Sequence, residues 1–511
     1  MGGNLFKTIV GAVILATLAF VTGSLVADGA KVAMAPIALV VGLFVMLCLG
    51  RNCWVLIYIL PPLISMLQIS LVANFPVAYL IAVVVLVYWL LMATMGYVKI
   101  TWTSLPALDI VTAVFVLYFA LTWMWNPVYL NFLVDEFTTE GEVMLGGRAY
   151  VWCVFAAILY VTMSIIPMER KAVIKLLKWL VWMSIVMGVL SSVIGLVQEG
   201  GYSTEEAETK RYAPFYAVAD PVYRALLCHW SILGIVCAPW KLVLLLISAF
   251  GIAMKGGRTD MMFAAVTLLV SQWFHRRLVI LIFAALAGYG TLLYLSSEKM
   301  LDDLPYGVKR VLTAVPGVEL RDTHIANEAQ GSLDWRYEMW RWAMDPSTGY
   351  IKDYVWGDGY GTNTAYFRLE RTIINRGIIY HGDPRLFAIK GAWHSGWVTA
   401  IHRTGYVGLV LSALWMFLAL WYITRVCKSF VGLDGCGAVW FALISIYASV
   451  VGFYISAGSM EDIFGMFFVV TLAKVLHAMQ LSDGYLQPMF SRVAYKPIMV
   501  DELLKSQRKE C

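Results

Sequence analysis

Two arginines and one histidine in the second half of the chain are of the residue types that recognise phosphate and accept a proton. Arg258 follows Gly256-Gly257 at the start of an apolar run, whereas Arg336 lies in a long polar interval. A guanidinium donates a forked pair of hydrogen bonds to phosphate oxygens, so two of them suit a pyrophosphate. His394 stands just before the next apolar run, and its imidazole, with an ordinary pKa of about 6.5, accepts protons near neutral pH. The pattern predicts an anion site and a general base.

Each of these residues also has a structural interpretation. An arginine at the end of a membrane span commonly extends its guanidinium to the lipid headgroups. Arg336 has Asp334 and Glu338 close by in the sequence as partners for a surface ion pair. A single histidine at a membrane interface is more often structural than catalytic. The sequence therefore leaves both interpretations open for Arg258, Arg336 and His394.

The polar interval from about 294 to 401 is the longest one in an otherwise apolar sequence. Asp334 is expected to cap a short helix, on which Arg336 and Trp340 share a face. Arg341 lies on the opposite side of that helix, so only one of the two arginines can face a given site, and Arg336 is favoured. The tryptophans of the interval predict that it lies against the membrane interface, where indole rings are stabilised.

The composition defines the class of protein that must position these residues. The chain has 511 residues, of which 60% are hydrophobic and only 14% are charged, which is outside the range of soluble globular proteins. Apolar runs long enough to cross about 30 Å of hydrocarbon recur along it. We therefore expect an all-α polytopic membrane protein with about fourteen spans. The expected spans are 6–27, 33–50, 53–72, 75–96, 107–125, 148–167, 173–197, 225–239, 241–255, 260–274, 278–295, 398–424, 437–457 and 463–480; the pair on either side of Pro239 is alternatively one broken element.

The distribution of Lys and Arg predicts the orientation, because cytoplasmic connections are enriched in basic residues. With a cytoplasmic N-terminus, the basic connections fall inside and the long polar interval falls outside; those connections hold Arg51, Lys99, Arg170-Lys171-Lys175, Lys241, His275-Arg276-Arg277 and Arg425-Lys428. Four segments follow: a membrane bundle over 1–295, an exterior loop over 296–397 with a helix around 334–344, further membrane helices over 398–480, and a cytoplasmic tail over 481–511.

Several other kinds of site find no support in the sequence. The seven histidines show no H-x-x-x-H or H-E-x-x-H spacing, so we expect no metal. The eight cysteines are scattered without a C-x-x-C pair and read as small apolar residues. Gly357-x-Gly359-x-Gly361 has no strand before it, so it is not a dinucleotide fingerprint. A net charge of +5 is too small for this length to indicate nucleic acid as a partner.

The order of these elements resembles the bacterial O-antigen ligase and O-antigen polymerase superfamily of membrane glycosyltransferases. The resemblance covers about 150 residues, from 255 to 410, and the other spans match only in being spans. The matching elements are Gly257-Arg258 at the start of a span, Arg336-x-x-x-Trp340-x-x-Ala343, Gly357-x-Gly359-x-Gly361, and His394-Ser395 followed by Gly405 and Gly408.

The resemblance implies a GT-C-type helical bundle of about 12–14 membrane helices in the bacterial inner (cytoplasmic) membrane, with its site under one large periplasmic loop. Such an enzyme transfers a glycan from an undecaprenyl-pyrophosphate carrier to a hydroxyl of a lipid or glycan acceptor, with inversion and without a metal or other cofactor. Arg258 and Arg336 match the family's pyrophosphate-binding arginines, and His394 matches its catalytic base. Secondary roles fall to Trp340, Arg341, Gly359 and Ser395, the last standing where the family usually has asparagine.

Three functional classes remain open at this point. Ligase and polymerase share every matching element, so the sequence does not choose between them. A lipid or polysaccharide transporter or flippase is the alternative from another class, although such proteins commonly bury charged residues in mid-span and repeat their halves. This sequence has its ionisable residues mainly at span ends and in one asymmetric loop. A non-catalytic membrane scaffold is the third possibility.

Overall fold

The computed structural model describes residues 49–66, 77–128, 144–145, 147–198, 214–321, 323–363, 393–430, 433, 435–455 and 460–482. The expected span 6–27, almost all of the span 33–50 and the tail beyond residue 482 lie outside the described residues. Within these ranges the regular structure is helical, apart from one antiparallel pair of two-residue strands, β1 (Met144–Leu145) and β2 (Thr362–Asn363).

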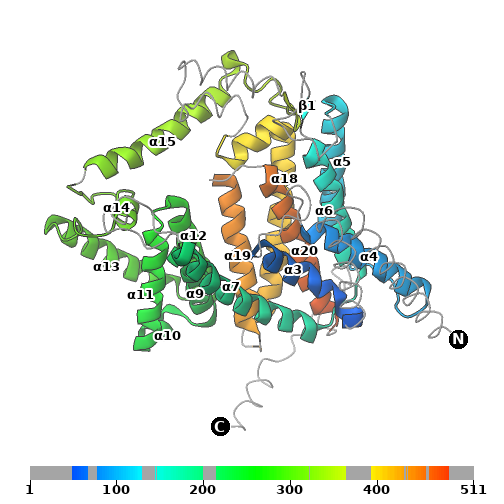
Figure 1. The fold of residues 1–511 in the computed structure, drawn as a ribbon, viewed down its shortest axis with the longest axis horizontal. Coiled ribbons are helices and arrows are strands. Elements are labelled where there is room, and N and C mark those ends of the chain that lie inside the picture. The colour runs from blue at the N-terminus through cyan, green and yellow to red at the C-terminus, as the bar shows by residue number, and fades with distance from the viewer. Residues whose placement is uncertain are drawn as a thin grey trace, which may run out of the picture.

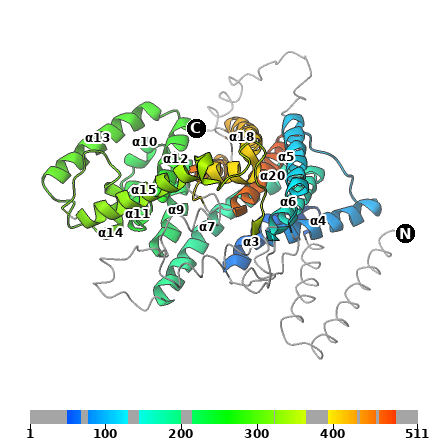
Figure 2. The same cartoon turned by 90° about the horizontal axis from the view of Figure 1, so that it is seen from above.

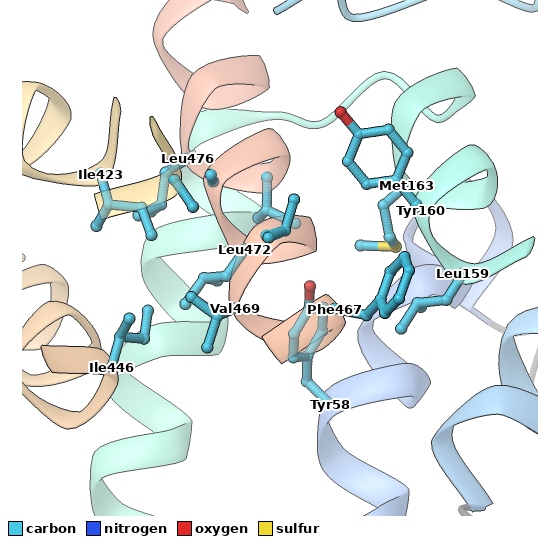
Figure 3. Packing of buried hydrophobic residues seen from close by; sticks show 14 of the residues in the cluster. Tyr58, Leu159, Tyr160, Met163, Ile423, Ile446, Phe467, Val469, Leu472 and Leu476 are labelled. Atoms are coloured by element: carbon cyan, nitrogen blue, oxygen red, sulfur yellow. The ribbon is translucent and has the colours of Figure 1, made fainter. Parts of the chain in front are cut away.

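One group of helices forms the largest apolar core. Figure 3 shows its centre, where Phe467 and Leu472 of α20 lie among side chains of neighbouring helices that include Ile446 of α19 and Leu159 of α6. These interior positions are apolar because no water reaches them, and close packing of their side chains holds the helices together. The group comprises η1 (Gly50–Val55), α3 (Leu56–Met66), α4 (Val77–Thr94), α5 (Pro106–Trp125), α6 (Gly147–Ile165), α7 (Arg170–Gln198), α18 (Gly396–Ser429), α19 (Cys436–Ile455) and α20 (Met460–Ser482).

A second group packs beside the first through contacts of α9 with α7 and of α12 with α19 (Figure 1). It comprises α9 (Pro214–His229), α10 (Ile232–Val236), α11 (Pro239–Met254), α12 (Arg258–Phe274) and α13 (Leu278–Ser297). The expected span 225–239 is wrong, because α9 ends at His229 and the next helix, α10, is only five residues long. Ser231 caps α10 by accepting a hydrogen bond from the Gly234 amide at 3.3 Å, and Pro239 starts α11, where a missing N–H costs nothing.

Four described helices are long and apolar enough to cross a membrane, namely Pro106–Trp125, Arg170–Ile194, Leu278–Ser297 and Gly396–Ser429. Six shorter apolar helices accompany them. α13 leaves large apolar side chains such as Phe283 exposed, and a helix that is apolar all round is typical of a membrane span. The protein is thus a helical membrane protein, while the total of about fourteen spans stays a prediction.

The long polar interval contributes two helices of its own, α14 (Tyr306–Leu312) and α15 (Thr323–Met344). Figures 1 and 2 show α15 running from α14, beside the second group, across to the first turn of α18. The expected N-cap at Asp334 is wrong, because α15 begins at Thr323 and Asp334 lies in its middle. The upstream residues continue the helix, and the Asp334 carboxylate accepts a hydrogen bond from the Gln330 side chain one turn earlier at 2.7 Å.

Candidate functional site

The site is built around an interruption in α18. Gly405 has φ of 66° and ψ of −177° inside this helix, so the helix is kinked there. Residues 353–361, which we call the strap, pack against the kink. Four backbone hydrogen bonds join the strap to the kink: Asp358 N to His402 O at 2.8 Å, Gly359 N to Arg403 O at 3.0 Å, Tyr406 N to Tyr354 O at 2.8 Å and Val407 N to Val355 O at 3.3 Å. The polar backbone groups exposed by the kink therefore find partners in the strap.

The glycines of the sequence pattern allow this close approach. A Cβ at Gly405 would come within 3.0 Å of the Val355 carbonyl, and one at Gly357 would do the same with the Thr404 backbone. Gly359 has φ of +76°, and a Cβ there would be 3.1 Å from the Asn126 Cβ. Gly357 and Gly405 are thus required by the packing of backbone on backbone, whereas Gly359 is favoured by its positive φ and by the nearby side chains of Asn126 and Tyr150. The secondary role expected for Gly359 is accordingly structural in this arrangement.

A buried arginine lies beneath the strap. The Arg403 guanidinium donates to the Gly361 carbonyl at 3.0 Å and to the Gly359 carbonyl at 3.4 Å, and the residue is 4% exposed. Tyr150 and Tyr360 lie beside it, and Tyr360 N donates to the Tyr150 hydroxyl at 3.3 Å. A buried guanidinium with several acceptors fixes the strap to α18. Sequence reasoning missed Arg403; the available signal was an arginine inside an apolar span.

A series of polar contacts leads from the strap to the segment before α18. Trp393 donates its indole N–H to His402 Nδ1 at 3.1 Å, and His402 Nε2 lies 3.6 Å from the Asp358 carboxylate. His402 therefore carries its proton on Nε2, because Nδ1 already accepts. On the other side, the Trp340 indole donates to the Trp393 carbonyl at 2.7 Å. Trp393 is thus held from both sides, by α15 and by α18.

His394 follows directly in the chain and has an unusual backbone. Its φ is 47°, in the left-handed region that residues other than glycine rarely adopt. The imidazole is half-buried, and its ring centroid is 5.5 Å from that of Trp335 on α15. Burial lowers the pKa of His394 below its usual value, and the positive charge of Arg336 lowers it further. The imidazole is therefore neutral at pH 7 and has a lone pair to accept a proton.

The structure brings Arg336, Trp340, His394 and Ser395 together at the start of α18, although they come from two distant segments. Ser395 is the N-cap residue of this helix, is completely buried, and its hydroxyl has no hydrogen-bond partner among the described residues. Arg341 is exposed on α15. Of the two arginines on this helix, Arg336 is therefore the one on the side of the histidine; the helical spacing predicts that only one of them can be.

Arg258 is the first residue of α12, and only its backbone is described. Gly256 before it has φ of +68°, which ends α11 and turns the chain into α12. The Asp260 carboxylate folds back over Gly257, the N-cap residue, and is paired with the Lys255 ammonium at 3.0 Å. An internal carboxylate thus already occupies part of the helix N-terminus that was expected to face an external anion.

A further arginine, which sequence reasoning missed, joins this turn to the loop helices. Arg310 on α14 donates to the Gly256 carbonyl at 3.2 Å and forms an ion pair with Glu328 on α15 at 3.4 Å. The signal in the sequence was a basic residue between Val308 and Leu312 on the apolar face of a short helix. α15 is therefore linked to the Arg258 turn near one end and to His394 near the other.

The described residues include no group of three or more His, Cys, Asp or Glu side chains that could hold a metal ion. A basic residue, a neutral imidazole and several indoles are thus the chemical groups that this end of the bundle presents. No model of a known protein family matches the chain, and no curated protein sequence matches it either.

Proposed function

We propose that the protein is a metal-independent, inverting membrane glycosyltransferase that moves a glycan from an undecaprenyl-pyrophosphate carrier to an acceptor hydroxyl. The observation that carries the proposal is the packing of α15, which bears Arg336, against the segment of His394: the ring centroids of Trp335 and His394 are 5.5 Å apart, and the Trp340 indole donates to the Trp393 carbonyl at 2.7 Å. A cation that binds phosphate and a base that accepts a proton are the two functions this reaction requires. The resemblance to the O-antigen ligases and polymerases supports the same assignment.

The reaction needs one proton transfer and one bond exchange. His394 takes the proton from the acceptor hydroxyl while that oxygen attacks the sugar C1 from the face opposite the leaving group. The bond between C1 and the pyrophosphate oxygen breaks, and its electron pair goes to the pyrophosphate. Arg258 and Arg336 stabilise the charge that develops there, which lowers the barrier because the charge is larger in the transition state.

The position of Arg336 gives the histidine a second useful property. Its positive charge contributes to lowering the pKa of His394 in the ligand-free protein, after burial. A pyrophosphate bound to Arg336 would offset that charge, and the imidazole would then hold a proton more strongly. The base thus becomes stronger when the donor is in place. This couples proton abstraction to the presence of the leaving group.

The proposed enzyme acts in the bacterial inner membrane, with the site facing the periplasm. Support comes from the end of α5, which the positive-inside rule assigns to the exterior, and from the contacts that join this end to the strap and to α18. The Tyr118 hydroxyl near the end of α5 hydrogen-bonds the Trp356 carbonyl of the strap at 2.9 Å and the Thr404 carbonyl of α18 at 2.7 Å. O-antigen or exopolysaccharide polymerase is the variant in which the acceptor is itself a glycan.

One observation favours a lipid or polysaccharide transporter as a second candidate. Lys474 of α20 is completely buried, forms an ion pair with Asp109 of α5, and donates to the Thr103 carbonyl at 2.6 Å. Buried charge pairs within a membrane bundle are common in transporters. This pair, however, involves the first turn of α5, which is the opposite end of that helix from the strap and Tyr118.

The decisive experiment uses purified protein, a glycan linked to undecaprenyl pyrophosphate, and candidate acceptors, with and without EDTA. Glycan transfer that persists in EDTA, disappears in His394→Ala and continues in His324→Ala is the expected result. His324 is the matched control because it is a second histidine of the same loop, exposed on α15. Full activity of His394→Ala would refute the proposed base.

The same assay tests the arginines and the second candidate. Arg258→Ala and Arg336→Ala are expected to raise the donor KM and reduce kcat, whereas Arg341→Ala leaves both unchanged. Movement of the lipid donor across proteoliposomes without any glycan transfer would favour the transporter. Loss of that movement in Lys474→Met would then assign it to the buried charge pair.

A further inference from the structure

The Arg310 side chain lies where two parts of the chain meet. α14 docks on the end of α11 so closely that a Cβ at Gly307 would come within 3.0 Å of the Met254 carbonyl. This docking places Arg310 against the turn that precedes α12, and its Nη1 donates to the Gly256 carbonyl at 3.2 Å. Gly256 is two residues from Arg258, a separation of at most about 7 Å of chain. Arg310 therefore contacts the turn that carries Arg258, the predicted pyrophosphate ligand.

The second arm of the Arg310 guanidinium holds a carboxylate. Its Nη2 lies 3.4 Å from Glu328 Oε1, and the Tyr306 hydroxyl donates to Glu328 Oε2. A phosphate group can accept hydrogen bonds from a guanidinium and a phenol hydroxyl as well as a carboxylate can, because carboxylate and phosphate present their oxygens at similar spacing. The Glu328 carboxylate thus has the position and the partners of a bound anion.

The ion pair between Arg310 and Glu328 is exposed enough for another anion to replace the carboxylate. The Glu328 side chain is 39% exposed, whereas that of Arg310 is 9% exposed and lies beneath it. An ion pair with one partner in solvent is weak, because water competes for the exposed charge. The other carboxylate of the turn, Asp260, is engaged by Lys255. One exposed carboxylate therefore lies on Arg310, which in turn contacts the turn that carries Arg258.

We propose that Arg310 is a further pyrophosphate-binding residue, and that the Glu328 carboxylate occupies the position of the pyrophosphate in the ligand-free protein. The lipid-linked pyrophosphate displaces the Glu328 carboxylate and takes its hydrogen bonds from Arg310 and Tyr306. Displacement also releases the N-terminal half of α15 from α14, while its C-terminal half stays attached to Trp393. The identity of the anion rests on the proposed function; the presence of an anion site does not.

The test measures binding of inorganic pyrophosphate to the purified protein in detergent by isothermal titration calorimetry. Glu328→Gln keeps the size of the side chain and removes its charge, so pyrophosphate should bind about two- to fivefold more tightly. Arg310→Lys removes the forked donor and should weaken binding about tenfold. Glu319→Gln is the matched control, because Glu319 is an exposed carboxylate of the same loop whose hydrogen bonds with Ser296 involve only its backbone, and pyrophosphate binding by this variant should equal that of the wild type.

Unchanged or weaker pyrophosphate binding in Glu328→Gln overturns the inference, and this result decides it even if Arg310→Lys does not fold. Glycan transfer separates the inference from the proposed function. Transfer that depends on His394, together with pyrophosphate binding that is insensitive to Arg310 and Glu328, would refute only the inference. The expected changes in pyrophosphate binding without transfer to any acceptor would instead leave the anion site standing and refute the transferase.

Discussion

Replacing Gly405 with alanine tests whether the kink of α18 and the strap form one unit. The substitution puts a Cβ at φ of 66° and ψ of −177°, a conformation almost confined to glycine. It also brings that Cβ within 3.0 Å of the Val355 carbonyl. The backbone conformation costs ~1–3 kcal/mol and the crowding a similar amount, so the free energy of unfolding should fall by about 2–6 kcal/mol.

Two control variants separate the two contributions. Gly349 has φ of +67°, and nothing lies within 4 Å of the position that a Cβ would take there, so Gly349→Ala reports the cost of a positive φ alone. Gly290 on α13 has open space and ordinary helical φ, so Gly290→Ala should leave the stability unchanged or raise it by up to about 1 kcal/mol. The thermal unfolding midpoint, followed by tryptophan fluorescence in detergent, is expected to fall most in Gly405→Ala, less in Gly349→Ala and not in Gly290→Ala.

Limited proteolysis supplies the local measurement. If the strap detaches when Gly405 is replaced, cleavage within residues 353–361 should become faster than in either control variant. A Gly405→Ala protein that melts no lower than Gly349→Ala and keeps the wild-type cleavage rate would refute the reasoning. The close approach of the strap to α18 would then not depend on the absence of a side chain at position 405.

Three further predictions concern His394 and its neighbours. Because burial and then Arg336 lower the pKa of His394, activity should fall only as the pH drops through a value below about 6.5; Arg336→Gln should move this acid limb of kcat/KM to higher pH, and Arg341→Gln should not. Trp340→Phe removes the donor to the buried Trp393 carbonyl, so the free energy of unfolding should fall by ~1–3 kcal/mol and kcat should fall too. An unchanged melting temperature would contradict this prediction. His394→Asn should keep its stability to within ~1 kcal/mol, because asparagine tolerates a positive φ, while the transfer rate falls about 10²- to 10⁴-fold; a rate near wild type would exclude the base.

Local patterns in the sequence predicted most of the helices. Apolar runs end where charges, glycine or proline appear, and α5, α6, α7, α12, α13, α18 and α19 begin and end within a few residues of the expected spans. This worked because hydrophobic length is a property of one segment and does not depend on what packs against it. It failed at 225–239, where α9 ends at His229 and the Ser231 cap starts a separate short helix, although the apolar run looks continuous in hydropathy.

The candidate site was predictable in its residue types and only partly in its arrangement. Helical spacing separated Arg336 from Arg341, and the structure has Arg336 beside His394. Spacing could not reveal Arg403 or Arg310, since each is recognisable only through carbonyl groups supplied by a distant segment. Gly357 and Gly405, which the sequence offered only as elements of a resemblance, are contact points between the strap and α18.

The sequence by itself determined that the protein is a helical membrane protein, which segments are apolar, and which residues could bind phosphate or accept a proton. Only the tertiary structure decided that α15 reaches from the Arg258 turn to His394, that α18 is kinked at Gly405, and that Glu328 lies on Arg310. The reason is physical. Hydrophobicity and helical periodicity act within one segment, whereas a binding site depends on the contacts between segments that close packing selects.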